Sequence, residues 1–125
     1  MKPEDHILDI VSNHLKISID EMKGRTRQRA VVEAKQVFCY LCRNLLPLSF
    51  KQIGNILNID HATVLHSVKA IEDRMFIYPR EKTSIENLMI MVKGRIDVLM
   101  PDLITINEEI YMENNFYTNL ELNNK

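Results

Sequence analysis

The sequence has little of what marks β-rich, disulfide-stabilised or membrane-spanning proteins. It contains three glycines, two cysteines and no tryptophan in 125 residues. Sandwiches and barrels need frequent glycine-containing turns, so a glycine-poor chain rich in Leu, Ile and Met favours an all-α fold. Both cysteines fall on one predicted helix, which argues against a secreted disulfide framework. Residues 1–5 lead into charge rather than a signal sequence, and no apolar run reaches bilayer length, so we expect a cytoplasmic protein.

Charge is distributed unevenly, although the formal net charge is only −1. Between Lys23 and Lys51 there are seven bases and a single acid, Glu33, for a local net charge of +6. From Phe76 to Lys125 there are five bases and eight acids, for a net charge of −3. A basic region beside an acidic one is typical of a phosphate-binding surface.

Helical spacing of apolar residues predicts several helices in the first half of the chain. The first follows Pro3, and a second, short one is opened by the capping box Ser18-x-x-Glu21. Residues 25–29, Arg-Thr-Arg-Gln-Arg, are expected to form an exposed basic loop. A longer amphipathic helix is predicted over about Ala30–Leu45.

A second pair of helices is predicted after Pro47. The capping box Ser49-x-x-Gln52 opens a short helix, residues 58–60 form a tight break, and a longer helix follows over about 61–75. Apolar residues of the longer helix are expected to face inward: Val64, Leu65, Val68, Ile71 and Met75. Six other residues of this helix are expected to face outward: His61, Ala62, Thr63, His66, Lys69 and Asp73.

The last part of the chain is predicted to be a helical extension. Pro79 is expected to break the chain, and Thr83 with Glu86 to start an amphipathic helix that Pro101 ends. Its apolar stripe is Ile85, Leu88, Met89, Val92, Ile96 and Leu99. The stripe can pack within the chain or form the seam of a homodimer. We therefore expect a domain at residues 1–78 and, at 79–125, an extension with an acidic, Asn-rich tail.

The segment from about Ser49 to Arg74 has the pattern of a helix-turn-helix: a short helix, a three-residue turn and a longer helix with a polar outer face. In that motif the first helix braces the second, whose N-terminal side chains enter the DNA major groove. Many helical bundles also pair a short helix with a long one, so spacing alone leaves both interpretations open.

The side chains that open the 61–75 helix suit base recognition. Asp60 can accept a hydrogen bond from a cytosine amino group, and His61 can donate one to guanine N7. The methyl groups of Ala62 or Thr63 can pack against thymine. One turn further on, His66 and Lys69 are placed to meet phosphates. Asp60 is also a good N-cap, which it would be with or without DNA.

The run from Asp60 to His66 resembles a signature of the DnaA replication-initiator family, Asp-His-Thr-Thr-Val-Leu-His, in six of seven positions, with Ala62 the exception. Residues 49–54 resemble the first helix of that family's DNA-binding motif, and residues 25–29 its Arg-rich loop. The resemblance covers about residues 5–74. It implies an all-α, Trp-repressor-like helical bundle that binds double-stranded DNA at a DnaA-box-like, A·T-rich site.

The resemblance also implies roles for single residues. Asp60, His61 and Thr63 would face the major groove, His66 and Lys69 would hold the backbone, and an arginine at 25 or 27 would enter the minor groove. The full set expected to contact DNA is Arg25, Arg27, Arg29, Lys51, Asp60, His61, Ala62, Thr63, His66 and Lys69.

The chain departs from the family pattern in several places. Asn58-Ile59 stands where the family has Gly-Gly-Arg, and Ala70 stands where it has a base. Each lost phosphate contact weakens binding and flattens its salt dependence. The chain also has no Gly-x-x-x-x-Gly-Lys-Ser/Thr phosphate loop, so we expect no ATPase activity. An alternative is a protein-interaction module of the same fold with weak or lost DNA affinity, acting on the replication or transcription machinery.

Two other interpretations are disfavoured. Cys39 and Cys42 followed by His61 and His66 resemble a Cys₂His₂ zinc finger, but 18 residues separate Cys42 from His61, against roughly 12 in that motif. Cysteines in the middle of a helix are usually core residues, and we expect that here. The histidines have no nucleophile or orienting group beside them in sequence, so we expect no enzyme. No metal or cofactor is expected.

Overall fold

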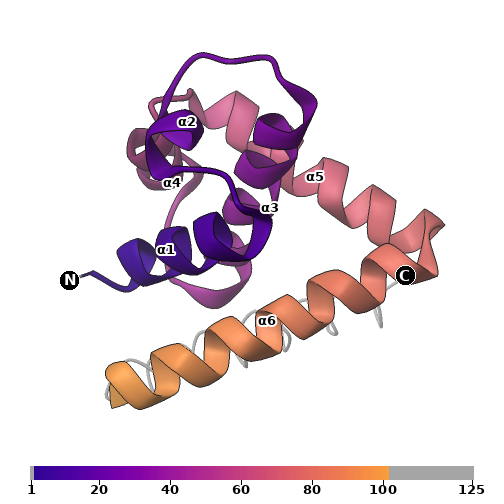
Figure 1. Cartoon of the computed structure of the whole chain (residues 1–125). Helices are drawn as coiled ribbons and strands as arrows, with labels where there is room; N and C mark the ends of the chain where they lie inside the picture. Colours follow the sequence, from indigo (N-terminus) through magenta and orange to yellow (C-terminus); the bar gives the residue numbers. More distant parts are fainter. Residues whose placement is uncertain (1, 102–125) are drawn as a thin grey trace, which may run out of the picture.

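Residues 2–101 are described by the structure, a computed structural model (Figure 1). This part of the chain contains six α-helices and no strand, which confirms the predicted all-α class with its C-terminal helical extension. The helices are α1 (Pro3–Leu15), α2 (Ile19–Lys23), α3 (Arg29–Leu45), α4 (Phe50–Leu57), α5 (His61–Ile77) and α6 (Pro79–Leu99).

Both predicted capping boxes are present. Ser18 Oγ accepts a hydrogen bond from the Glu21 N–H at 3.1 Å and opens α2. At the start of α4, Ser49 Oγ accepts from the Gln52 N–H at 3.1 Å, and Gln52 Oε1 accepts from the Ser49 N–H at 2.8 Å. These bonds satisfy N–H groups that a helix cannot pair internally, which is why the helices begin at these residues.

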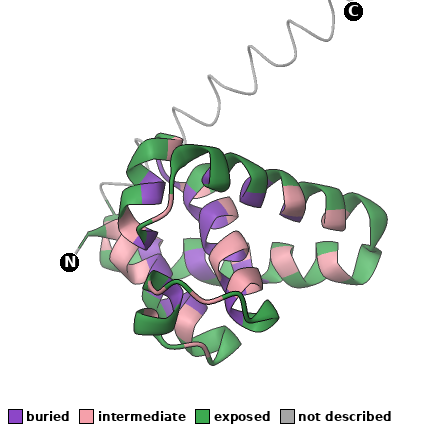
Figure 2. Cartoon of the chain, turned by 90° about the horizontal axis from the view of Figure 1, so that it is seen from above, coloured by how far each residue is buried: buried purple, intermediate pink, exposed green. Residues whose placement is uncertain are grey.

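Helix α3 lies at the centre of the fold and packs against all five of the others. Its residues Phe38, Cys39 and Leu41 are fully buried. Figure 2 shows the buried residues gathered between the helices, with exposed residues on the outer turns. Burying a large apolar side chain such as Phe38 or Leu41 stabilises the folded state by roughly 1.5–3 kcal/mol. The core therefore holds the helix-turn-helix, α4 and α5, against a rigid central support.

Both cysteines are core residues, as predicted. Cys39 and Cys42 are fully buried on α3. Burial disfavours the charged thiolate and raises the pKa of Cys39 to about 12, while the Ser67 hydroxyl hydrogen-bonded to it acts in the opposite direction. Within residues 2–101 no group of three or more His, Cys, Asp or Glu side chains is placed to hold a metal ion.

The predicted inner face of α5 is wrong at one residue. Val64, Val68 and Ile71 are buried, and Met75 packs partly against the core, but Leu65 is 48% exposed. Successive helix residues are rotated by about 100°. Leu65 therefore falls outside the arc that holds the buried residues. The helix also runs two residues beyond its predicted end at Met75.

The predicted start of the last helix is wrong. Helix α6 begins at Pro79, not at Thr83, because proline suits the first helical position, where its missing N–H is not needed. Thr83 lies inside the helix, where its hydroxyl donates to the Pro79 carbonyl at 3.1 Å. A single residue, Tyr78, separates α5 from α6.

The apolar stripe of α6 packs within the chain. Leu88, Val92 and Ile96 are buried in the same core as the preceding helices, so this stripe is not a dimer seam. Leu99, predicted to belong to the stripe, is 52% exposed. Within residues 2–101 no helix combines the length and apolar character needed to cross a bilayer. The predicted acidic, Asn-rich tail beyond Pro101 lies outside the described residues.

Candidate DNA-binding surface

Helices α4 and α5 form the predicted helix-turn-helix, with a turn at residues 58–60. Asn58 ends α4 in the left-handed conformation, with φ 58° and ψ 40°. Asparagine adopts that conformation more readily than most residues, because its short polar side chain can bond locally. The turn closes when the Ile59 N–H donates to the Gly54 carbonyl at 2.9 Å.

Gly54 allows the two helices of the motif to approach closely. A Cβ atom at this position would lie 2.4 Å from the Ile59 carbonyl oxygen. That oxygen belongs to the backbone and cannot rotate away, so only glycine fits without moving the turn. The sequence predicts no role for Gly54 beyond its place in the segment 49–54 that resembles the family motif. A glycine inside a helical pattern would have been the signal for such a close contact.

The start of α5 combines a helix cap with exposed polar side chains. Asp60 Oδ1 accepts a hydrogen bond from the Thr63 N–H at 2.7 Å. Bonding with Thr63 lowers the pKa of Asp60 below its ordinary value, so the carboxylate stays ionised. Any bond from Asp60 to a base must therefore share the carboxylate with the helix cap.

The outward face predicted for α5 is present. His61, Ala62, Thr63, His66 and Lys69 are all exposed, while Val64, Ser67, Val68 and Ile71 are buried on the opposite side. The first N–H groups of α5 add a partial positive charge at this end of the helix, which attracts phosphate oxygens. The arrangement can present polar side chains and a positive helix end to a nucleic acid.

The basic loop is anchored while its arginines are exposed. The Lys35 ammonium group donates to the Gly24 carbonyl at 2.6 Å, and the Gln28 N–H donates to Thr26 Oγ1 at 3.2 Å. Arg25 and Arg27 are exposed between these anchors. The sequence assigned residue 29 to the loop as well, which is wrong, because Arg29 is the first residue of α3.

Part of the basic charge counted in the sequence stabilises the fold. Arg43 donates to the Leu48 carbonyl at 3.0 Å and lies 4.5 Å above the Phe50 ring, which braces the connection from α3 to α4. Arg29 forms an ion pair with Glu33 at 3.1 Å. Among the predicted contact residues, Lys51 at the start of α4 is exposed.

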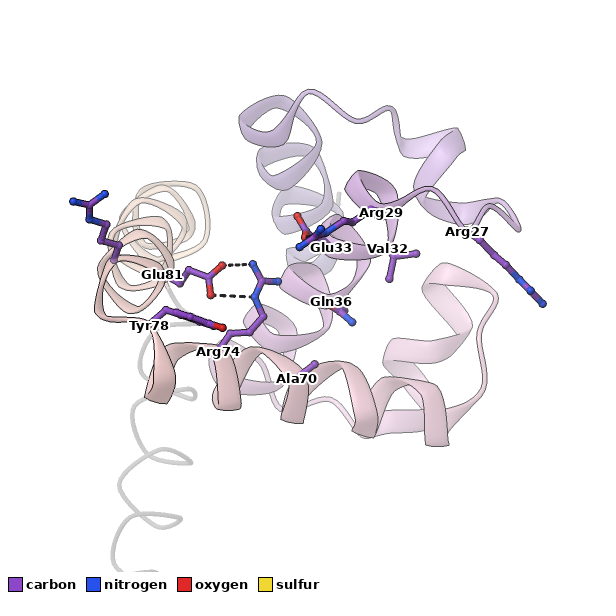
Figure 3. Close-up of a pocket in the computed structure, with 10 residues that line it drawn as sticks. Arg27, Arg29, Val32, Glu33, Gln36, Ala70, Arg74, Tyr78 and Glu81 are labelled. Atoms are coloured by element: carbon purple, nitrogen blue, oxygen red, sulfur yellow. Dashed lines mark hydrogen bonds and ion pairs between the residues drawn. The ribbon is translucent and has the colours of Figure 1, made fainter.

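A groove of about 940 Å³ connects the basic loop with the far end of α5. In Figure 3, Arg27 lies at one end, and Val32, Gln36 and Ala70 lie between the two helices that border it, α3 and α5. Arg74 and Glu81 point toward one another at the other end. The groove thus brings together side chains from the loop, α3, α5 and α6.

The Arg74–Glu81 pair closes the corner between α5 and α6. Arg74 Nη2 donates to Glu81 Oε1 at 2.6 Å and Nε donates to Oε2 at 3.2 Å. This bidentate bonding raises the pKa of Arg74 and lowers that of Glu81. Both side chains are about one-third exposed, so solvent screens their attraction, which contributes at most about 1 kcal/mol.

Comparison with known proteins identifies the family of the part of the chain that contains the basic loop, α4 and most of α5. Residues 4–71 match a family model described as the helix-turn-helix of bacterial DnaA protein. The chain is 35% identical over 100 residues to the chromosomal replication initiator protein DnaA of Clavibacter sepedonicus, covering 74% of this chain and 20% of that protein. It is 32% identical over 92 residues to the protein of the same name from Bacteroides fragilis, covering 73% and 19%. The chain thus spans about a fifth of the length of these relatives.

Proposed function

Since the chain belongs to the family of bacterial DnaA helix-turn-helix domains, we propose that it binds double-stranded DNA through α5 and the basic loop. The observation that carries this proposal is the shared groove. Arg27 of the loop and Ala70 of α5 line the same groove, although 42 residues separate them in sequence. One duplex can therefore meet both.

The recognition step is assigned to the start of α5. His61 and Thr63 would contact base edges in the major groove, with the Ala62 methyl group packed against thymine. Asp60 caps the helix and would share its carboxylate between the cap and a cytosine amino group. His66 and Lys69, one to two turns further along the exposed face, would contact phosphates.

The loop would read the shape of the neighbouring minor groove. Arg25 and Arg27 are exposed on an anchored segment, so inserting one of them requires little ordering of the backbone. A narrow A·T-rich minor groove attracts an inserted arginine because its electrostatic potential is more negative. Arg29 and Lys51 would add phosphate contacts on either side. The preferred site is proposed to be A·T-rich, and the protein to act by binding, without catalysis.

The test is fluorescence anisotropy with a labelled duplex carrying a DnaA-type box and with a scrambled duplex, over a salt series. His61→Ala should weaken binding to the box by about 1–3 kcal/mol and reduce discrimination. Lys69→Ala should weaken binding to both duplexes and lower the salt slope by about 1. If His61→Ala left discrimination unchanged, α5 would not be the recognition helix.

The second candidate is the protein-interaction module, and one observation favours it. Large apolar side chains are exposed at the end of α5 and on the outer side of α6: Phe76 is 91% and Val98 81% exposed. Contiguous exposed apolar patches often mark contacts with other proteins, whereas single exposed apolar residues are common on monomeric domains. Weak binding to both duplexes that disappears at physiological salt would favour this candidate.

A further inference from the structure

The groove extends well beyond the helix-turn-helix. Arg74 lies 11 residues after Thr63 on α5, or about 16 Å along the helix axis. Arg74 lines the groove together with Tyr78 and Arg80 at the corner between α5 and α6. These residues lie outside the part of the chain that matches the family model.

We infer that this corner of the groove is a second phosphate-binding site, in which Arg74 and Arg80 contact the backbone of the duplex whose bases α5 reads. This inference rests on the proposed function. Because DNA rises about 3.4 Å per base pair, the phosphates concerned would lie up to about five base pairs from the bases at the start of α5.

The charges of the groove favour an anion. Four arginines line it (Arg27, Arg29, Arg74 and Arg80) against two acids (Glu33 and Glu81), an excess of two positive charges. The other exposed acids near this corner, Glu72 and Asp73 on α5 and Glu86 on α6, do not line the groove.

The geometry of Arg74 suits a phosphate. Glu81 engages Nε and Nη2, and it is the one ion-pair partner of Arg74 within residues 2–101. The Nη1 group is therefore left to donate to another acceptor. The ion pair also favours one orientation of the planar guanidinium, which reduces the entropy lost when it binds a phosphate oxygen.

The backbone of DNA is a better occupant than a free phosphate ion. The groove is open and far larger than one phosphate group, and it is continuous with the proposed DNA surface at Arg27. A free ion would need a small enclosed site with several converging donors. A polymer of phosphates can instead occupy the full length of the groove.

The test compares three groove variants with two controls in the anisotropy assay, using the whole chain. Arg74→Gln and Arg80→Gln should each weaken binding to box and scrambled duplexes by about threefold to tenfold and lower the salt slope by about 0.9. Glu81→Gln should have the opposite effect on the affinity for DNA. It removes a negative charge but keeps an acceptor for Arg74, and should strengthen binding about twofold to fivefold.

The controls carry the same substitutions on exposed α6 residues outside the groove. Arg95→Gln and Glu86→Gln should leave affinity and salt slope within error of the unmodified protein. Thermal unfolding of every variant shows whether the corner remains folded. If Arg74→Gln unfolds the corner, Arg80→Gln and Glu81→Gln still test whether the corner binds the DNA backbone, because neither removes the Arg74 side chain.

The outcomes separate this inference from the proposed function. If the unmodified protein binds the box duplex but the three groove variants behave like the controls, the second site is refuted and the proposed function stands. If no duplex is bound, both are refuted. Inorganic phosphate, added at constant ionic strength, should compete no better than chloride. Phosphate-specific competition that Arg74→Gln abolishes would show a free-ion site and overturn the assignment to DNA.

Discussion

Replacing Gly54 by alanine should destabilise the protein by separating α4 from the turn. The new Cβ would lie 2.4 Å from the Ile59 carbonyl oxygen and 3.4 Å from the Asp60 carbonyl carbon. Both atoms are backbone, so the strain cannot be relieved by rotating a side chain. Forcing extra atoms into a packed site typically costs about 1–3 kcal/mol. Removing glycine from a helix returns about 0.5–1 kcal/mol. The expected net loss is about 0–2.5 kcal/mol, centred near 1 kcal/mol.

The matched control is Gly94→Ala on α6. A Cβ at Gly94 would have no heavy atom within 4 Å, so only the gain in helix propensity remains, about 0.5–1 kcal/mol of added stability. For a domain of this size 1 kcal/mol corresponds to roughly 4–8 °C in Tm. Thermal and urea unfolding followed by circular dichroism should therefore shift in opposite directions for the two variants.

The displaced turn should also affect DNA binding. Because the Ile59 carbonyl immediately precedes the residue that caps α5, moving it reorients the start of that helix relative to α4. We expect Gly54→Ala to reduce discrimination between box and scrambled duplexes even at temperatures where it is fully folded. If Gly54→Ala were as stable as Gly94→Ala, the close approach of α4 and the turn would not exist as described.

Three further results are expected. Leu88→Ala should cost about 2–5 kcal/mol of stability, whereas Leu65→Ala should cost less than about 1 kcal/mol; equal losses in urea unfolding would contradict their different burial. Hydrogen bonds at the start of α5 and from Arg74 lower the pKa values of Asp60 and Glu81. The two carboxyl groups therefore lose their protons more readily in the folded state than in the unfolded state. Their contribution to the stability of the fold is fully present above about pH 4, and it is lost as the pH falls through their lowered pKa values. The urea concentration at the midpoint of unfolding should fall in this acidic range. It should fall less in a variant that carries both Asp60→Asn and Glu81→Gln. Both buried cysteines should resist a maleimide at pH 8 until the protein unfolds; rapid native labelling would contradict their burial.

Local patterns were sufficient to predict most helix boundaries. The boxes at Ser18 and Ser49 each form as expected, because a cap depends on only four neighbouring residues. The turn at residues 58–60 was found for the same reason. The prediction for Pro79 is wrong because a proline can either break a helix or begin one, and its neighbours in sequence do not distinguish the two.

The sequence determines the buried face of a helix less fully than it determines the helix itself. Leu65 and Leu99 are apolar, and their positions nearly fit the helical spacing of the buried residues, but both are exposed. The width of a buried face depends on which helices cover it. The same holds for the α6 stripe, whose partner turned out to be the core of the same chain. Spacing identifies an apolar face without identifying what packs on it.

The sequence by itself determined the helical class, the helix-turn-helix and the polar residues at the start of α5, because periodicity, capping and a short motif are encoded within a few adjacent residues. Only the tertiary structure decided that Lys35 and Arg43 brace the fold, and that Gly54 sets the approach of the turn. It also decided that Arg27 and Arg74 share a groove. Those relations join residues that lie apart along the chain, and they exist only once packing brings the helices together.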